Sequence, residues 1–172
     1  REVVAGLRVF AARDARDVLI RFREFCSSAP DEFCGLVVIT RSPPFPFLDS
    51  QWHGQPVAIL ASCWCGTPTI AKSALAPLEM PELLLGGMME QMPYVVWQKI
   101  MDPSAPSGRF NYWKTVSFSS LQDQTIDLLA SKAADLPSLQ SEIHVHHLGG
   151  AVARVARAET AFDQRDVQFF VN

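Results

Sequence analysis

The sequence lacks every short motif that would indicate catalysis or nucleotide binding by itself. It contains no G-x-S-x-G, no H-E-x-x-H, no P-loop and no dinucleotide-binding fingerprint. It also has no Lys/Arg run and no apolar stretch of the roughly 18 residues that a membrane-spanning helix needs. With a net charge of −3, neither nucleic acid nor a membrane surface is predicted as a partner.

Cysteine is scarce, and its spacing does not predict a disulfide framework. The four residues are Cys26, Cys34, Cys63 and Cys65. Reduced thiols and a cytoplasmic location are therefore the expectation. A zinc site built from Cys63, Cys65 and two histidines is an alternative, although C-x-C is not the usual C-x(2–4)-C spacing.

The remaining composition is that of a folded domain. The chain has 172 residues, of which 48% are hydrophobic and 19% charged, so one globular domain is predicted. It begins with Arg1 rather than Met and passes at once into a strand-like run. We therefore expect the natural N-terminus to lie outside this sequence.

Apolar residues recur with both the period of strands and the period of helices. The predicted order is a strand at 2–10, a helix at 13–26, strands at 33–40 and 56–64, helices at 69–77 and 94–101, a strand at 109–118, a helix opened by a capping box at Ser120, and strands at 142–148, at 151–156 and from 166. Gly6 is expected at a bulge, and the methionine-rich part near Gly86-Gly87 reads as a packed loop or as an adaptable binding surface. Hairpin-joined strands with intervening helices indicate the α+β class, with an antiparallel-dominated β-sheet carrying helices on one face.

Three of the four histidines lie on the predicted strand at 142–148. Alternation places Ile143 and Val145 on one face, where they should pack on helices, and His144 and His146 on the other. The second face would then present two imidazoles side by side. An unperturbed imidazole titrates near pH 6.5, so His146 is expected to accept a proton near neutral pH.

Three interpretations of these histidines stay open. They could line a substrate pocket, or they could be two polar residues on an open sheet face together with one inner residue, His147. They could also bind a metal, since H-x-H sets two imidazoles on one face, but the sequence implies no thiol or carboxylate to complete the site. The strand predicted at 109–118 places Tyr112 beside Lys114 and Trp113 opposite; Lys114 could equally be a solvated surface charge.

The run HHLGGAVARVARAETAFDQRD resembles a signature in the substrate domain of FAD-linked oxidases of the berberine-bridge-enzyme type. That signature has Gly-Gly, a short strand ending in Arg-Val, and then Thr-Ala-Phe-Pro-His-Arg-Asp. The matching residues are Gly149, Gly150, Ala151, Arg154, Val155, Thr160, Ala161, Phe162, Arg165 and Asp166, whereas Asp163 and Gln164 replace Pro-His. The segments VLIRFREFCSSAPDEFCGLVVITRSPP, MPYVVWQKI and RFNYWKTV also look like this family's middle region.

The resemblance implies the cap domain of such an oxidase. Residues 1–172 would be a single substrate-binding domain, a fragment lacking the N-terminal FAD-binding domain and a C-terminal segment. The full-length enzyme would use FAD to take a hydride from a small organic substrate, with oxygen as acceptor. The fragment alone is expected to bind no flavin and to be inactive, and the face left without its FAD-binding domain is expected to favour a homodimer.

The resemblance also implies site residues. Tyr112, Lys114, His144 and His146 would bind substrate. The catalytic residue is not identified, because many family members carry Glu or Gln on the last strand where this chain has Val171, or Gln168 in a shifted register. The alternatives are a free-standing α+β module for ligand binding or dimerisation, and a metal-dependent enzyme centred on the histidines.

Overall fold

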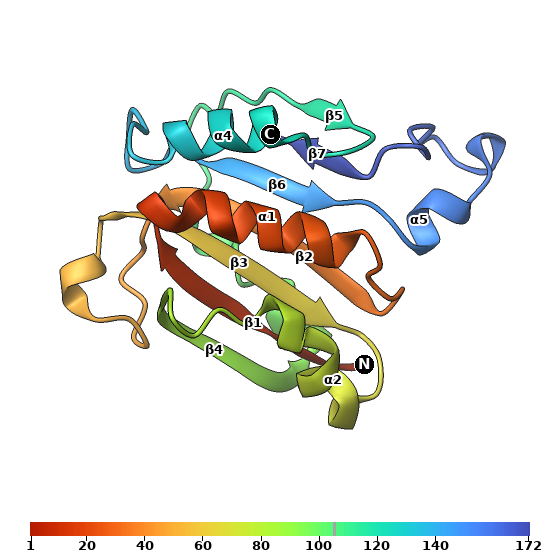
Figure 1. The fold of residues 1–172 in the computed structure, drawn as a ribbon, viewed down its shortest axis with the longest axis horizontal. Coiled ribbons are helices and arrows are strands. Elements are labelled where there is room, and N and C mark those ends of the chain that lie inside the picture. The colour runs from red at the N-terminus through yellow and green to blue at the C-terminus, as the bar shows by residue number, and fades with distance from the viewer. Residues whose placement is uncertain (105) are drawn as a thin grey trace.

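The computed structural model describes residues 1–104 and 106–172. Seven strands form one sheet in the order β4-β1-β3-β2-β6-β7-β5, and every neighbouring pair is antiparallel (Figure 1). The strands are β1 (Glu2–Ala11), β2 (Phe33–Arg41), β3 (Pro56–Trp64), β4 (Leu84–Pro93), β5 (Val116–Phe118), β6 (Ile143–His147) and β7 (Phe169–Val171). The predicted α+β class with an antiparallel sheet is confirmed.

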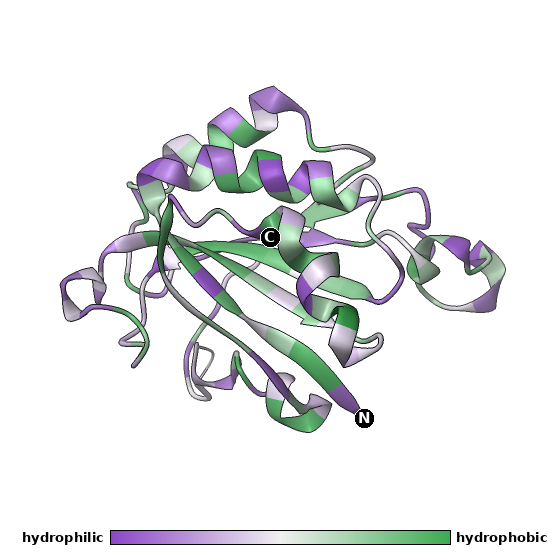
Figure 2. Cartoon of the chain, turned by 60° about the horizontal axis from the view of Figure 1, so that its bottom comes forward, coloured by the Kyte–Doolittle hydropathy of each residue, from purple (hydrophilic) through white to green (hydrophobic). Residues whose placement is uncertain are grey.

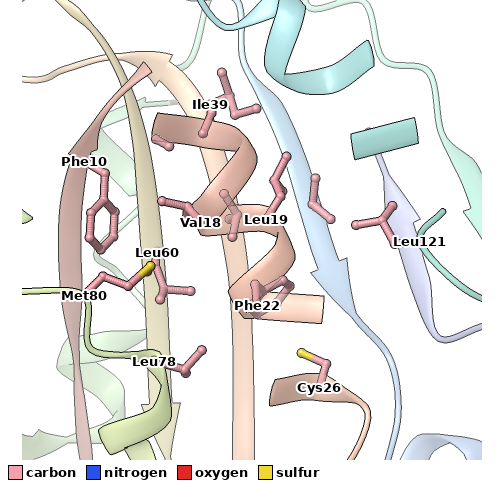
Figure 3. Close-up of a cluster of buried hydrophobic side chains, with 14 of the residues drawn as sticks. Phe10, Val18, Leu19, Phe22, Cys26, Ile39, Leu60, Leu78, Met80 and Leu121 are labelled. Carbon is pink, nitrogen blue, oxygen red and sulfur yellow. The ribbon is translucent and has the colours of Figure 1, made fainter. Parts of the chain in front are cut away.

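The longer helices cover one face of this sheet. They are α1 (Ala15–Cys26), α2 (Pro68–Leu75) and α4 (Asp123–Lys132), with short helices α3 (Tyr94–Trp97) and α5 (Ala151–Arg154) elsewhere. Helix α1 buries Val18, Leu19 and Phe22, whose helical spacing sets them on one side. Figure 3 shows these side chains between α1 and the strands, near Ile39 and Leu60.

The opposite face is covered only in part and by irregular segments. A second buried cluster includes Leu7, Val38 and Ile59, against which residues of the loop at 42–55 and of the segment after α3 pack. Strands β1, β2 and β3 are therefore apolar on both faces, which explains the largely hydrophobic strands in Figure 2. None of the helices among the described residues is both long and apolar enough to cross a bilayer.

Several predicted elements agree with the structure. Helix α1 follows the spacing of its apolar residues, and α2 begins at Pro68 with Thr67 as its N-cap residue. Helix α4 buries Ile126, as expected. It starts later than the predicted capping box at Ser120, since Gln122 occupies the N-cap position.

Several other predictions were wrong, and the helix predicted at 94–101 ends at Trp97. The methionine-rich part predicted as a loop is the edge strand β4, held by its pairing with β1. Only Val116–Phe118 of the predicted strand at 109–118 is a strand, and the last strand begins at Phe169. The strand predicted at 151–156 is instead the short helix α5.

Gly6 lies in a regular part of β1, and the register shift falls between Val9 and Phe10. A Cβ atom at Gly6 would lie 1.8 Å from the carbonyl oxygen of Met88. The residue is thus required by the close approach of β1 and β4 and not by a bulge.

Candidate functional site

Strand β6 places its side chains on the two faces as the alternation predicts. Ile143 and Val145 join the helix-side core, and the ring of His147 lies 5.6 Å from that of Phe169 on the same side. His144 and His146 point to the other face, where His144 is paired with Val38 and His146 with Leu36 in the neighbouring strand β2. Among the described residues of β6, the imidazoles of His144 and His146 therefore lie together on the face opposite to the long helices.

The two imidazoles are adjacent, but they are not openly solvated. Their ring centroids lie 5.6 Å apart. His144 is only 9% exposed, and Trp113 approaches its ring edge-on at 6.4 Å. His146 stacks on Phe170 of β7 with centroids 4.2 Å apart and planes 8° from parallel. Each imidazole thus has its own aromatic neighbour.

Glu142 completes a pair with His144. The Nε2 atom of His144 lies 2.7 Å from Oε2 of Glu142, and both side chains are largely buried. If Nε2–H donates to the carboxylate, Nδ1 is left as a proton acceptor. In the part of the chain that the structure describes, the hydrogen bond of the His144 ring is the one from Nε2 to Glu142. Alternation along the strand predicted at 142–148 puts Glu142 on the same face as His144, but no role was predicted for it.

A cavity of about 440 Å³ opens beside this pair. Its lining brings together three of the four predicted site residues, Tyr112, Lys114 and His144. Polar side chains dominate the rest of the lining: Ser138, Gln140, Ser141, Glu142 and Asn172, with Trp113 as an aromatic wall. His146, the fourth predicted residue, does not line the cavity.

Tyr112 and Lys114 are neighbours as expected, although no strand aligns them. The Lys114 Nζ atom lies 5.9 Å from the centroid of the Tyr112 ring. Tyr112 is 85% exposed, and residues 109–115 have no regular secondary structure. In this segment the aromatic ring next to an imidazole is that of Trp113, which alternation had assigned to the opposite side.

His146 was predicted to accept a proton near neutral pH, but its surroundings make its imidazole a weak base. Burial, together with the neighbouring imidazole of His144, lowers the pKa of His146 to about 4. Burial also lowers the pKa of His147. His146 is therefore neutral at pH 7, and its stacking on Phe170 fits a role in shaping the face.

The described residues do not assemble a metal site. Among them no group of three or more His, Cys, Asp or Glu side chains is placed to hold an ion. The four cysteines are free, and the Cys63 and Cys65 sulfurs lie 3.8 Å apart. Burial raises the pKa of Cys63 to about 12. The zinc alternative receives no support from this arrangement.

The Gly-Gly sequence ends the histidine strand. Gly150 has φ +68°, a backbone conformation that residues other than glycine rarely adopt. Arg154, four residues later, pairs with Asp31 through two hydrogen bonds, one of them 2.9 Å long. Arg157 pairs with Asp166, and Arg165 donates to Thr160. Three arginines of the run HHLGGAVARVARAETAFDQRD thus stabilise this segment through hydrogen bonds to Asp31, Asp166 and Thr160.

Comparison with known proteins gives matches at the level of structure only. No protein-family model and no curated protein sequence matches the chain. Physcomitrella patens BBE-like 1 matches 99% of the chain with a TM-score of 0.71 and 14% identity. Carbohydrate oxidase from Microdochium nivale matches 99% with a TM-score of 0.66 and 16% identity. A variant of berberine bridge enzyme matches 99% with a TM-score of 0.65 and 14% identity.

The chain spans well under half of each of these proteins, namely 37%, 38% and 34% of their lengths in the same order. The match nevertheless includes almost all of the present chain. The fold implied by the resemblance in the sequence is confirmed: this chain has the α+β fold of a domain found in berberine bridge enzyme and carbohydrate oxidase.

Proposed function

We propose that this chain is the substrate-binding domain of an FAD-dependent oxidoreductase that oxidises a small hydroxylated molecule. The observation that carries the proposal is the hydrogen-bonded pair of Glu142 and His144 beside a cavity of about 440 Å³. A carboxylate that orients an imidazole is a common means of preparing a general base. The resemblance and the fold of oxidase domains support the same reaction class.

The residues of this chain are suited to binding the substrate of such an enzyme and not to binding the FAD dinucleotide. A pyrophosphate is usually held by backbone N–H groups of a glycine-rich loop that leads into a helix. Gly86 and Gly87 lie within a strand, and Gly149-Gly150 precedes a helix of only four residues. The FAD would therefore be held by a separate FAD-binding domain of the same protein. When bound there, the flavin would supply the hydride acceptor, with oxygen as the final oxidant.

Within the cavity, each neighbouring side chain has a definable task. Glu142 keeps the Nε2–H tautomer of His144, so that Nδ1 can take the proton of a substrate hydroxyl. Trp113 stands edge-on beside the His144 ring and would limit its contact with water. Lys114 and Tyr112 would bind the remainder of the substrate from the exposed rim.

The lining favours a polyhydroxylated substrate. Serine, glutamine and asparagine side chains offer hydrogen bonds, while Trp113 and Tyr112 offer flat apolar surfaces. The carbohydrate oxidase among the structural neighbours supports a sugar as the first class to be tested.

An exposed apolar surface is available for the FAD-binding domain. Helix α3 exposes Tyr94, Val95 and Val96, at 45%, 61% and 55%, and the segment beside the cavity exposes Phe110. Without its partner domain the chain is expected to associate, and a homodimer is the simplest product.

The experiment uses the longer protein that contains this chain, tested for bound FAD and for peroxide release with a panel of mono- and disaccharides. His144→Ala and Glu142→Gln should each lower turnover, the former by about 10²–10⁴-fold, as expected for loss of a general base. His146→Ala is the matched control and should have a smaller effect.

The chain of residues 1–172 alone should be colourless and inactive. A longer protein without flavin would instead support a free-standing ligand-binding or dimerisation module. If flavin is present but His144→Ala retains turnover within twofold of wild type, the assignment of the base is wrong.

A further inference from the structure

A second cavity, of about 260 Å³, lies at the other end of the sheet. It is bounded by β1, the edge strand β4 and the turn after α2, and its lining includes Arg8, Glu79, Met80, Pro81, Leu84 and Met88. It shares no lining residue with the histidine cavity, and strands β3 and β2 separate β1 from β6 in the sheet. Nothing in the proposed oxidase function uses it.

Among residues 1–104 and 106–172, Arg8 is the one buried Arg, Lys, Asp or Glu side chain, and it is incompletely paired. The residue is 7% exposed. Its Nη2 atom lies 3.7 Å from Oε1 of Glu79, which is too long for a hydrogen bond. Its Nη1 atom is buried and has no hydrogen-bond partner among residues 1–104 and 106–172. A buried guanidinium with an unused donor is expected to bind an acceptor.

The rest of the lining is apolar and adaptable. Met80, Pro81, Leu84 and Met89 contribute thioether and hydrocarbon surface, whereas Met88, paired with Leu7, turns its side chain to the other face of the sheet. Figure 3 shows Met80 directed into the core between Phe10 and Leu78, so one wall of the cavity is anchored. Methionine side chains fill irregular space and adjust to ligands of varied shape. The cavity thus joins one cationic donor to a flexible hydrocarbon lining.

We propose that this cavity binds an aliphatic monocarboxylate of medium chain length. The guanidinium would hold the carboxylate through paired N–H donors, a geometry that matches a planar two-oxygen acceptor. The alkyl chain would lie against Met80, Leu84 and Met89. Glu79, whose side chain is 51% exposed, would turn into the solvent and leave its place beside Arg8 to the ligand.

The ligand class follows from both halves of the site. An inorganic anion would use the guanidinium but leave the methionine lining uncovered. A neutral alcohol of the same length would cover the lining but leave Nη1 without a charged acceptor. Only a molecule with a carboxylate head and an apolar tail satisfies both.

The test is a titration of the 172-residue chain with octanoate, followed by NMR shifts of the backbone amides of Arg8, Gly87 and Met88. Saturable binding at one site is expected. Octanoate should bind more tightly than acetate, with a gain of up to about fourfold for each added methylene. Octanol should bind at least tenfold more weakly than octanoate.

Two variants and one control make the result decisive. Arg8→Met should weaken octanoate binding at least tenfold. Glu79→Gln should tighten it several-fold, because the competing carboxylate is removed. His144→Ala alters only the other cavity and should leave octanoate binding unchanged, whatever it does to turnover in the longer protein.

The proposal is overturned if octanol binds as tightly as octanoate or if Arg8→Met binds like wild type. Should Arg8→Met fail to fold, as judged by circular dichroism, Glu79→Gln decides: unchanged or weaker binding then refutes the site. Because octanoate binding needs neither flavin nor substrate, its outcome is independent of the oxidase proposal.

Discussion

The two faces of the sheet are built in different ways, and β6 shows the difference at successive residues. Val145 is fully buried under the helices in the largest apolar cluster. His144 and His146 point to the face without long helices, where their neighbours are aromatic rings and a carboxylate. The helix-covered face therefore provides most of the apolar burial, while the opposite face contains polar groups whose contacts are specific.

Similar substitutions on the two faces of β6 should therefore change the free energy of unfolding by unequal amounts. On the helix side a new charge finds no partner and no water. On the histidine side a charged or polar group meets Glu142, the second imidazole or the cavity. The following predictions test that inequality, from the largest effect to the smallest.

Val145→Asp should have the largest effect, because it buries a carboxylate among hydrocarbon side chains. We expect a loss of more than about 4 kcal/mol in the free energy of unfolding, which would leave the domain largely unfolded. His146→Asp is the matched control on the same strand and should be clearly less damaging. Urea unfolding followed by circular dichroism measures both, and equal losses would contradict the comparison.

Phe22→Ala should come next. Phe22 is fully buried and makes edge-on contacts with the rings of Phe33 and Phe169. Its removal should cost about 3–5 kcal/mol of unfolding free energy through lost burial and an unfilled cavity. Phe170→Ala, on the histidine face, should cost less because that side chain is only partly buried. The same urea unfolding experiment ranks the two, and the reverse order would be evidence against the proposed division.

His146 should make stability depend on pH. Its pKa is lowered to about 4 in the folded protein, whereas an imidazole in the unfolded chain titrates near 6.5. The unfolded state therefore binds a proton first, and stability should fall as the pH drops from about 6.5 to 4. After allowance for partial solvation, the loss between pH 7 and pH 5 should be on the order of 1 kcal/mol.

The variant His146→Phe isolates this contribution, since it keeps an aromatic ring over Phe170 but cannot bind a proton. Its unfolding free energy should vary less between pH 7 and pH 5 than that of wild type. His147, whose pKa burial also lowers, remains in both proteins. An identical pH dependence in the variant would assign the effect to other groups.

Trp113→Ala should have the smallest effect on stability. Trp113 is 62% exposed, so its loss should change the unfolding free energy by less than about 0.5 kcal/mol. It should nevertheless uncover His144, whose ring it approaches at 6.4 Å. We expect faster modification of His144 by diethylpyrocarbonate, with Phe110→Ala as the control. An unchanged modification rate would mean that Trp113 does not shield the imidazole.

Local pattern was sufficient for the elements that pack on the core. Apolar spacing located α1, and alternation divided β6 correctly into a core face and a histidine face. It was insufficient where neighbours determine the conformation. Glycine is a weak strand former, yet the segment that contains Gly86 and Gly87 is the strand β4 because β1 supplies its hydrogen bonds. Conversely, the aromatic residues at 109–115 resemble a strand, but this segment pairs with no neighbouring strand.

The sequence by itself determined the fold class, the buried side of each main helix and the two faces of the histidine strand, because burial follows the 3.6- and 2-residue periods. Only the tertiary structure decided which polar groups meet. The approach of Trp113 to the His144 ring and the incomplete pairing of Arg8 with Glu79 depend on distances between segments far apart in the chain. Those distances are set by strand order and loop packing, which no local period encodes.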